Sequence, residues 1–389
     1  MGESKNNSEE NKQMNEEVNG VELSEEDLGV AETKKLIEEA ETEVSKNRKI
    51  PPVRFEIFYG AHGSESDSKG LEELFKDTDL FIVEQSGWDE QSLAQFRDLA
   101  LKRLTPEGYL TEYYSKQRER LINSGIIWTD EHVSLEKLEK SDSMSGFRKK
   151  IAHMLYNSHK PVAFIDLPAG HSINQKLGKH YFKEGDSAKD LNGLINQKKV
   201  FLREEADLHN VREDHMLAQL PKAIEDLIKD KPYLLGKDQT DKLKVLLFLG
   251  ATHTRLSHLL TRYGQEVKRK FSHSPFLFNY GTEALRRYSL GFEIDRELIE
   301  RVLLEETITS FLGTFLEFIT SDSMRLLMYI RVVVSKFTIP EMENILQSPF
   351  HHAVGLILDY FDKKGIKPPH SEADLDKFYM STFRHGIKS

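Results

Sequence analysis

The sequence predicts an α/β protein with a largely parallel central sheet, flanked by helices and followed by a helical C-terminal extension. Apolar runs of strand length alternate with segments of helical periodicity over roughly the first 270 residues. These runs are continuously apolar, which is typical of parallel strands that are buried on both faces. In the last third of the chain the apolar residues recur at helical spacing instead.

Residues 1–50 are expected to form an acidic and mostly disordered tail. The chain up to Glu43 has fourteen acidic and four basic residues, so this segment alone accounts for the net charge of −10. Such a composition buries too little apolar surface to stay folded by itself. Ser24 and Asp27 resemble a capping box, which predicts one helix within the tail.

Residues 51–270 are expected to form the α/β domain. Strands are predicted at VRFEIFYG, DLFIVEQ, VAFIDLP and Lys244–Leu249, with helices between them. A helix break is expected at Pro106, and a long helix is predicted over Arg203–Lys229. Residues 170–186 are polar and contain glycine and histidine, so they are expected to form a loop.

Residues 271–389 are expected to form helices that pack on the α/β body. Helices are predicted over Glu283–Asp322, Met324–Phe337 and Phe350–Lys363. The β-branched stretch LLMYIRVVVSKF is also compatible with a strand that completes the sheet. The apolar segment Ile308–Ile319 fits packing either on the α/β body or on a second copy of the chain, so the sequence also allows a homo-oligomer.

The composition argues against several classes of protein. Cysteine is absent, which excludes disulfides, a thiolate nucleophile and cysteine-bound metal. No apolar run approaches the ~18 residues of a membrane-spanning helix, and the start of the chain is unlike an export signal. We therefore expect a cytoplasmic protein that does not bind a membrane. Beyond the acidic tail the charges balance, and no basic patch predicts binding to nucleic acid.

Polar side chains follow each predicted strand, at the edge where parallel sheets bind ligands. His62 follows the first strand in Tyr59-Gly60-Ala61-His62, Glu84 ends the second, Asp166 ends the third, and His253 follows the fourth in Gly250-Ala251-Thr252-His253. Strand ends are polar in any α/β protein, because the chain leaves the apolar core there. This pattern alone therefore also fits residues without a catalytic role. Asp166 before Leu-Pro also fits a simple turn.

These residue types suggest hydrolysis. His62, Glu84 and His253 can hold a divalent metal whose bound water attacks a substrate, or the histidines can activate water directly. Arg212 on the long helix can stabilise a developing oxyanion, although an arginine among acidic residues often belongs to a solvated ion-pair surface. His209 lies one helical turn before Arg212, where a packing or surface role is expected.

Taken in order, these elements resemble the TraB/TIKI superfamily, which includes erythromycin esterases and the haem-binding ChaN proteins. FYGAHGS resembles its first Gly-x-x-His element, LFIVEQ its glutamate, VREDHM its helical arginine, and FLGATH its second Gly-x-x-His element. The likeness covers about residues 55–260. The first element here is one residue shorter than in the family, and Glu213 stands where the helical motif commonly has Asn or Asp.

The resemblance implies that His62, Glu84, Arg212 and His253 form the site. It implies a hydrolase acting on a peptide or a small ester, with or without a divalent metal such as Mn, Co or Zn. It equally allows a non-catalytic module that binds haem or another ligand. A third alternative is an interaction protein whose helical part and acidic tail recruit a partner while the site is vestigial.

Overall fold

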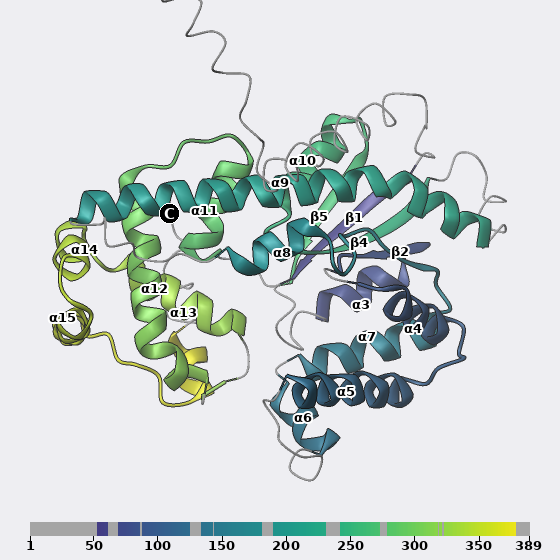
Figure 1. Ribbon diagram of the computed structural model, residues 1–389, viewed down its shortest axis with the longest axis horizontal. Coiled ribbons are helices and arrows are strands. Elements are labelled where there is room, and N and C mark those ends of the chain that lie inside the picture. The colour runs from purple at the N-terminus through teal and green to yellow at the C-terminus, as the bar shows by residue number, and fades with distance from the viewer. Residues whose placement is uncertain are drawn as a thin grey trace, which may run out of the picture. The chain divides into compact units, whose positions relative to one another are not determined.

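A five-stranded sheet lies at the centre of the part of the chain that this computed structural model describes (Figure 1). The strand order is β3-β2-β4-β1-β5, and every neighbouring pair in it is parallel. The strands are β1 (Val53–Gly60), β2 (Leu80–Val83), β3 (Val162–Phe164), β4 (Leu243–Gly250) and β5 (Glu266–Phe271). The α/β class predicted from the sequence is confirmed.

The structure describes residues 53–60, 69–85, 88–124, 134–142, 144–180, 190–230, 242–272, 278–317, 319–320 and 323–378. The acidic tail expected over residues 1–50, with its helix, lies outside these ranges, and so does His62. Residues 49–389 belong to one compact unit. None of the described helices combines the length and the apolar character needed to cross a lipid bilayer.

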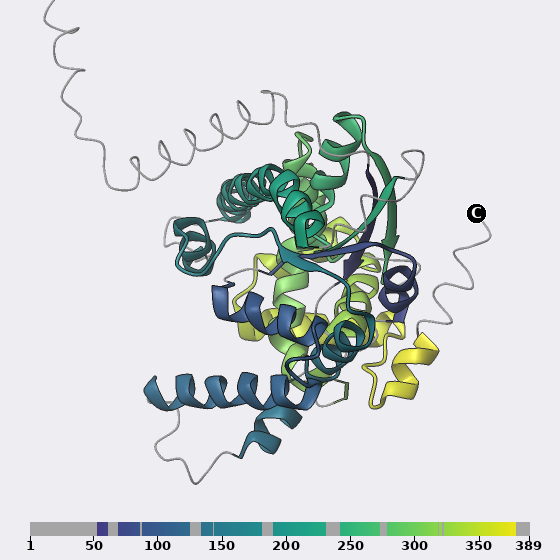
Figure 2. The same cartoon turned by 90° about the vertical axis from the view of Figure 1, so that its right-hand side faces the viewer.

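Helices cover both faces of the sheet, as the side view in Figure 2 shows. One face packs against α9 (Leu191–Asp230) and α10 (Thr254–Arg262). The other face packs against α3 (Lys69–Lys76), α4 (Glu90–Ala100), α5 (Pro106–Asn123) and α7 (Ser145–Ser158), with the short α6 (Leu135–Ser141) beside α5. Burial on both faces explains why β4 is apolar at seven of its eight positions, Lys244 being the exception.

Two edge strands differ from the prediction. The third predicted strand shrinks to the three residues of β3, and the chain leaves the sheet before Asp166. β5 is missing from the prediction because its sequence, EVKRKF, is charged at four of six positions and none of its residues is buried. Charged side chains are typical of an edge strand, where they hinder pairing with another chain, so apolar character cannot reveal this strand.

Two helices also differ from the prediction. The loop expected over residues 170–186 is wrong in its first half, because α8 (Ser172–Lys179) forms there. His171 starts this helix by accepting a hydrogen bond from the backbone N–H of Ile173, and the Ile173 side chain is buried. α9 begins twelve residues before the predicted Arg203, since Leu191, Ile195 and Leu202 extend its apolar face.

The C-terminal part is helical, as predicted. It comprises α11 (Tyr280–Ser289), α12 (Arg296–Glu317), α13 (Ser323–Ser335), α14 (Ile339–Leu346) and α15 (Phe350–Lys364). The single helix predicted over Glu283–Asp322 is wrong, because Gly291 with its positive φ of 80° ends α11 and Asp295 caps the start of α12. The stretch that left a strand open, LLMYIRVVVSKF, forms α13.

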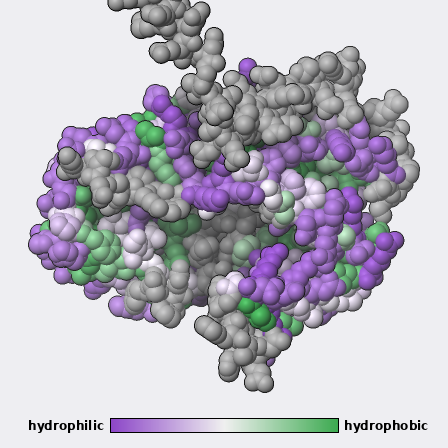
Figure 3. Space-filling view, viewed as in Figure 1, coloured by the Kyte–Doolittle hydropathy of each residue, from purple (hydrophilic) through white to green (hydrophobic). Residues whose placement is uncertain are grey.

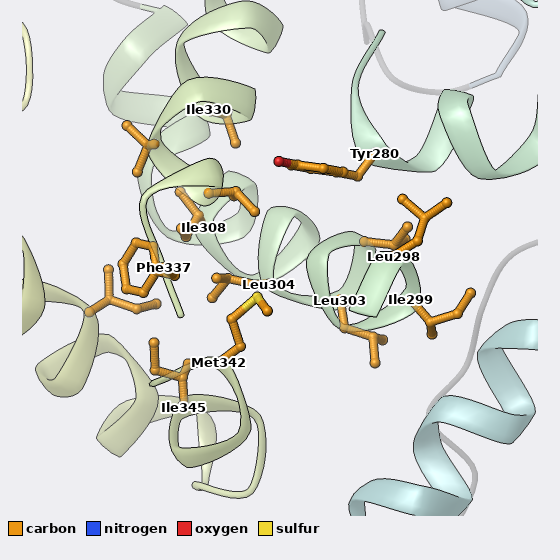
Figure 4. Close-up of a cluster of buried hydrophobic side chains, with 14 of the residues drawn as sticks. Tyr280, Leu298, Ile299, Leu303, Leu304, Ile308, Ile330, Phe337, Met342 and Ile345 are labelled. Atoms are coloured by element: carbon orange, nitrogen blue, oxygen red, sulfur yellow. The ribbon is translucent and has the colours of Figure 1, made fainter. Parts of the chain in front are cut away.

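The helix α9 belongs to two of the three apolar cores of the described residues, that of the C-terminal helices and that of one face of the sheet. Its first part packs into the cluster of the C-terminal helices, part of which is drawn in Figure 4, while its last part packs on the sheet. Figure 1 shows α9 running between these two regions. On the face drawn in Figure 3 the described surface is mostly hydrophilic, with hydrophobic side chains gathering over the C-terminal helices at the left.

Candidate functional site

The carboxyl ends of three neighbouring strands meet beside the middle of α9. β1 and β4 are in register, so that Gly60 lies opposite Gly250, and Val83 of β2 lies opposite Phe248 of β4. Glu84 is the first residue after β2 and continues the ladder through its N–H to the carbonyl of Phe248. The register therefore brings the predicted strand-end residues to one edge.

Glu84 is the centre of a hydrogen-bonded network. Its Oε1 accepts a hydrogen bond from Nη2 of Arg212 at 2.7 Å and lies 3.0 Å from Nε2 of His253. Its Oε2 accepts a hydrogen bond from the backbone N–H of Gly250. Glu84 thus joins the ends of β2 and β4 to α9, and its side chain stays 9% exposed.

Asp166 and Arg212 form the second part of the network. Nε of Arg212 donates to Oδ1 of Asp166 at 2.7 Å, and Nη2 donates to Oδ2, which is the bidentate geometry that arginine and carboxylates prefer. Asp166 is held in turn by the N–H of Leu167 at 2.7 Å. Since Asp166 is 1% exposed, its charge depends on Arg212.

His253 completes the network at the start of α10. The turn that follows β4 is fixed by a hydrogen bond of 3.0 Å from the backbone N–H of His253 to the carbonyl oxygen of Gly250. His253 occupies the N-cap position of α10, but its ring does not cap that helix. Instead its Nδ1 lies 3.2 Å from Oε1 of Glu213 and its Nε2 faces Glu84, so a carboxylate stands at each ring nitrogen.

Two histidines in this region have opposite pKa shifts. Burial opposes a charge on His253, but Glu84 and Glu213 outweigh it and raise its pKa to about 10. His253 is therefore an imidazolium at neutral pH. Burial lowers the pKa of His209 to about 3, helped by the positive charges of His253 and Arg212, so this second ring stays neutral. The two ring centroids are 5.8 Å apart.

The structure brings Glu84, Asp166, Arg212 and His253 together in one network, and His62 lies outside the described residues. Sequence reasoning missed Glu213 as the second partner of His253. It also gave His209 an ordinary packing or surface role. The available signal was helical spacing, because positions 209, 212 and 213 lie within one turn of α9 and share a face.

The described residues do not fit a divalent metal at the predicted position. A histidine binds metal through a ring nitrogen with a free lone pair, whereas both nitrogens of His253 face carboxylates that favour the protonated ring. Glu84 already accepts hydrogen bonds on both oxygens. Within the described ranges no three His, Asp or Glu side chains are grouped so that they hold a metal ion.

Comparison of the chain with protein-family models, curated proteins and solved structures finds no match. The resemblance to the TraB/TIKI superfamily therefore rests on the order of short motifs alone. The function has to be argued from the network itself.

Proposed function

We propose that the protein is a hydrolase that cleaves an ester or peptide bond with water. The observation that supports this most is that Arg212 and the His253 imidazolium both contact Oε1 of Glu84 at the carboxyl edge of a parallel sheet. Fixed positive charge in a largely buried site stabilises an oxyanion far better than it does in water. The resemblance to the superfamily adds support but no further geometry.

In the proposed reaction a water molecule attacks the carbonyl carbon of the substrate and His62 accepts its proton. Arg212 stabilises the negative charge that develops on the carbonyl oxygen. The bond to the leaving group then breaks, and the leaving group takes the proton from His62. His253 is a positioning residue in this scheme, because its ring holds Glu84, and Glu84 holds Nη2 of Arg212.

The proposed reaction needs no metal ion. The alternative expected from the sequence, a metal bound by His62, Glu84 and His253, requires His253 to lose its proton and at least one carboxylate partner. Element analysis of the purified protein tests this alternative. A stoichiometric metal that is present in the wild type and lost in His253→Asn would contradict the metal-free reaction. Absence of metal, together with hydrolysis that continues in the presence of EDTA, would support the metal-free reaction.

The experiment for the function is hydrolysis of a panel of p-nitrophenyl esters and N-acetylated fluorogenic peptides. We expect Glu84→Gln and His62→Ala to lower kcat/KM by about 10²–10⁴-fold on any substrate that the wild type cleaves. Glu73→Gln is the matched control, because Glu73 is 77% exposed and pairs only with Lys270 among the described contacts. Unchanged kcat/KM in correctly folded Glu84→Gln and His62→Ala proteins would contradict the proposal.

Haem addition tests the binding alternative. A Soret band that appears with the wild type and is lost in the His62 variant would favour a haem-binding module. The network argues against it for His253, whose nitrogens both face carboxylates. We propose that the enzyme is cytoplasmic. Light scattering of the purified protein tests whether it forms a homo-oligomer.

A further inference from the structure

One turn of α9 carries three buried polar atoms that have no hydrogen-bond partner among the described residues. They are Nδ1 of His209, Oδ1 of Asn210 and Oε2 of Glu213. A buried polar atom without a partner costs about 1–3 kcal/mol, so folded proteins contain few of them. Three on one turn beside the proposed site indicate that their partner is supplied from outside the chain.

Glu213 differs from the other carboxylates of this network in its second oxygen. Among the described residues, Glu84 and Asp166 both contact Arg212, whereas Glu213 contacts His253 through Oε1 alone. The next ion pair on α9 is neutral in itself, because Arg255 of α10 binds Asp214 at 2.7 Å. The buried carboxylate oxygen without a hydrogen-bond partner on this turn therefore belongs to Glu213 and not to Asp214.

The available atoms accept hydrogen bonds. A carboxylate oxygen and an amide oxygen are acceptors only, and the neutral ring of His209 offers an acceptor in one of its tautomers. A protonated primary amine has three N–H donors and one positive charge, which matches three acceptors of which one is a carboxylate oxygen. An anion would be repelled by the same carboxylate.

We propose that His209, Asn210 and Glu213 form a subsite that binds a protonated primary amine of the substrate. The amine is either the N-terminus of a peptide or amino ester, or a lysine side chain, and both carry the same ammonium group. His209 and Asn210 are half-buried, so this turn of α9 reaches the surface while the three atoms lie beneath it. This subsite rests on the proposed hydrolase function and deepens it by naming the substrate class.

Calorimetric titration of the full chain near pH 7 with three probes tests the proposal. L-leucinamide carries an α-ammonium, N-acetyl-L-lysinamide carries a side-chain ammonium, and N-acetyl-L-leucinamide carries neither. We expect one of the two ammonium probes to bind at least tenfold more tightly than the neutral probe, and which one it is identifies the source of the amine. In Glu213→Gln this preference is expected to fall to about twofold or less.

Asp214→Asn is the matched control. It removes the same charge from the next residue, but from a balanced pair with Arg255, so the amine preference is expected to persist. Asn210→Ala provides a second test that leaves the His253 contact intact, and it is expected to weaken ammonium binding about three- to tenfold. Circular dichroism checks that each variant is folded.

Several results would overturn the subsite. Equal affinity for all three probes, no binding of any probe, or a preference that survives in Glu213→Gln would each do so. An equal loss in Asp214→Asn would show a general effect of negative charge instead of a subsite. None of these results affects the hydrolase proposal, which is tested separately by cleavage of any substrate and by its loss in Glu84→Gln.

Discussion

The first part and the middle of α9 lie in regions that are stabilised differently. In the C-terminal helices the buried side chains are almost all apolar, and many residues share the packing. At the sheet edge the middle of α9 places Arg212 and Glu213 among other buried charges, each dependent on one or two partners. Apolar packing spreads a loss over many contacts, whereas a buried charge that loses its partner concentrates the cost.

The described part of the helical region also contains two buried carboxylates, Glu300, which pairs with Arg296, and Glu305, which holds the start of another helix. Oε2 of Glu305 on α12 accepts hydrogen bonds from the N–H groups of Tyr280 at 2.7 Å and Gly281 at 3.2 Å, which begin α11. Burial raises the pKa of Glu305 to about 7, although these two N–H groups oppose the shift. Glu305 thus resists ionisation, because burial outweighs the two N–H groups and the charge of Arg331.

The largest effect is expected from Arg212→Met, which leaves Glu84 and Asp166 without their cation. We expect the free energy of unfolding to fall by about 3–5 kcal/mol, as when one partner of a buried ion pair is removed. Urea denaturation measures this change. Arg203→Met on the same helix is the control, because its pair with Glu293 is exposed and should contribute less than about 1 kcal/mol. Similar losses in both variants would contradict a larger contribution of the buried network to the free energy of unfolding.

A smaller effect of pH is expected from Glu305. Because its pKa is raised in the folded state, it favours folding at acidic pH, and this contribution is lost as the pH rises from about 4.5 through about 7. Relative to Glu305→Gln, the wild type should therefore lose on the order of 3 kcal/mol between pH 4.5 and pH 8. Glu297→Gln, at an exposed position of α12, should leave the pH profile unchanged. Parallel profiles for wild type and Glu305→Gln would contradict this prediction.

The smallest effect, with the opposite sign, is expected from His209. Its pKa is lowered in the folded state, so its contribution is present above about pH 6.5 and is lost as the pH falls towards 3. Between pH 7 and pH 5 the wild type should lose about 2 kcal/mol more than His209→Leu. His258→Leu, at an exposed position of α10, is the control. If the free energy of unfolding of His209→Leu falls as much as that of the wild type between pH 7 and pH 5, the pKa of His209 is not lowered by its surroundings.

The sequence predicts the fold where apolar patterning carries the information. Continuous apolar runs identify β1, β2 and β4, and helical periodicity identifies α9 and α15. β5 escapes detection because an edge strand can be charged, and α8 escapes because its capping residue, His171, is not one of the usual cap residues. Local patterns therefore predict buried elements better than peripheral ones.

The candidate site is predictable to a similar extent. Strand-end position predicts Glu84, Asp166 and His253, because parallel topology brings such residues to one edge. Glu213 and His209 are separated from them by long stretches of chain, and only the direction of α9 across the sheet brings them near. The charge state of His253 depends on that three-dimensional arrangement, so sequence spacing cannot predict it.

The length of α9 has a consequence for how the chain unfolds. Forty residues of α-helix span about 60 Å, and two of the apolar cores use side chains from this one helix. Cutting the chain after residue 270 would strip the C-terminal partners from Leu191, Ile195 and Leu202 and expose them to water. We therefore expect these two cores to unfold together, because loss of order in one of them weakens the helix that also packs in the other.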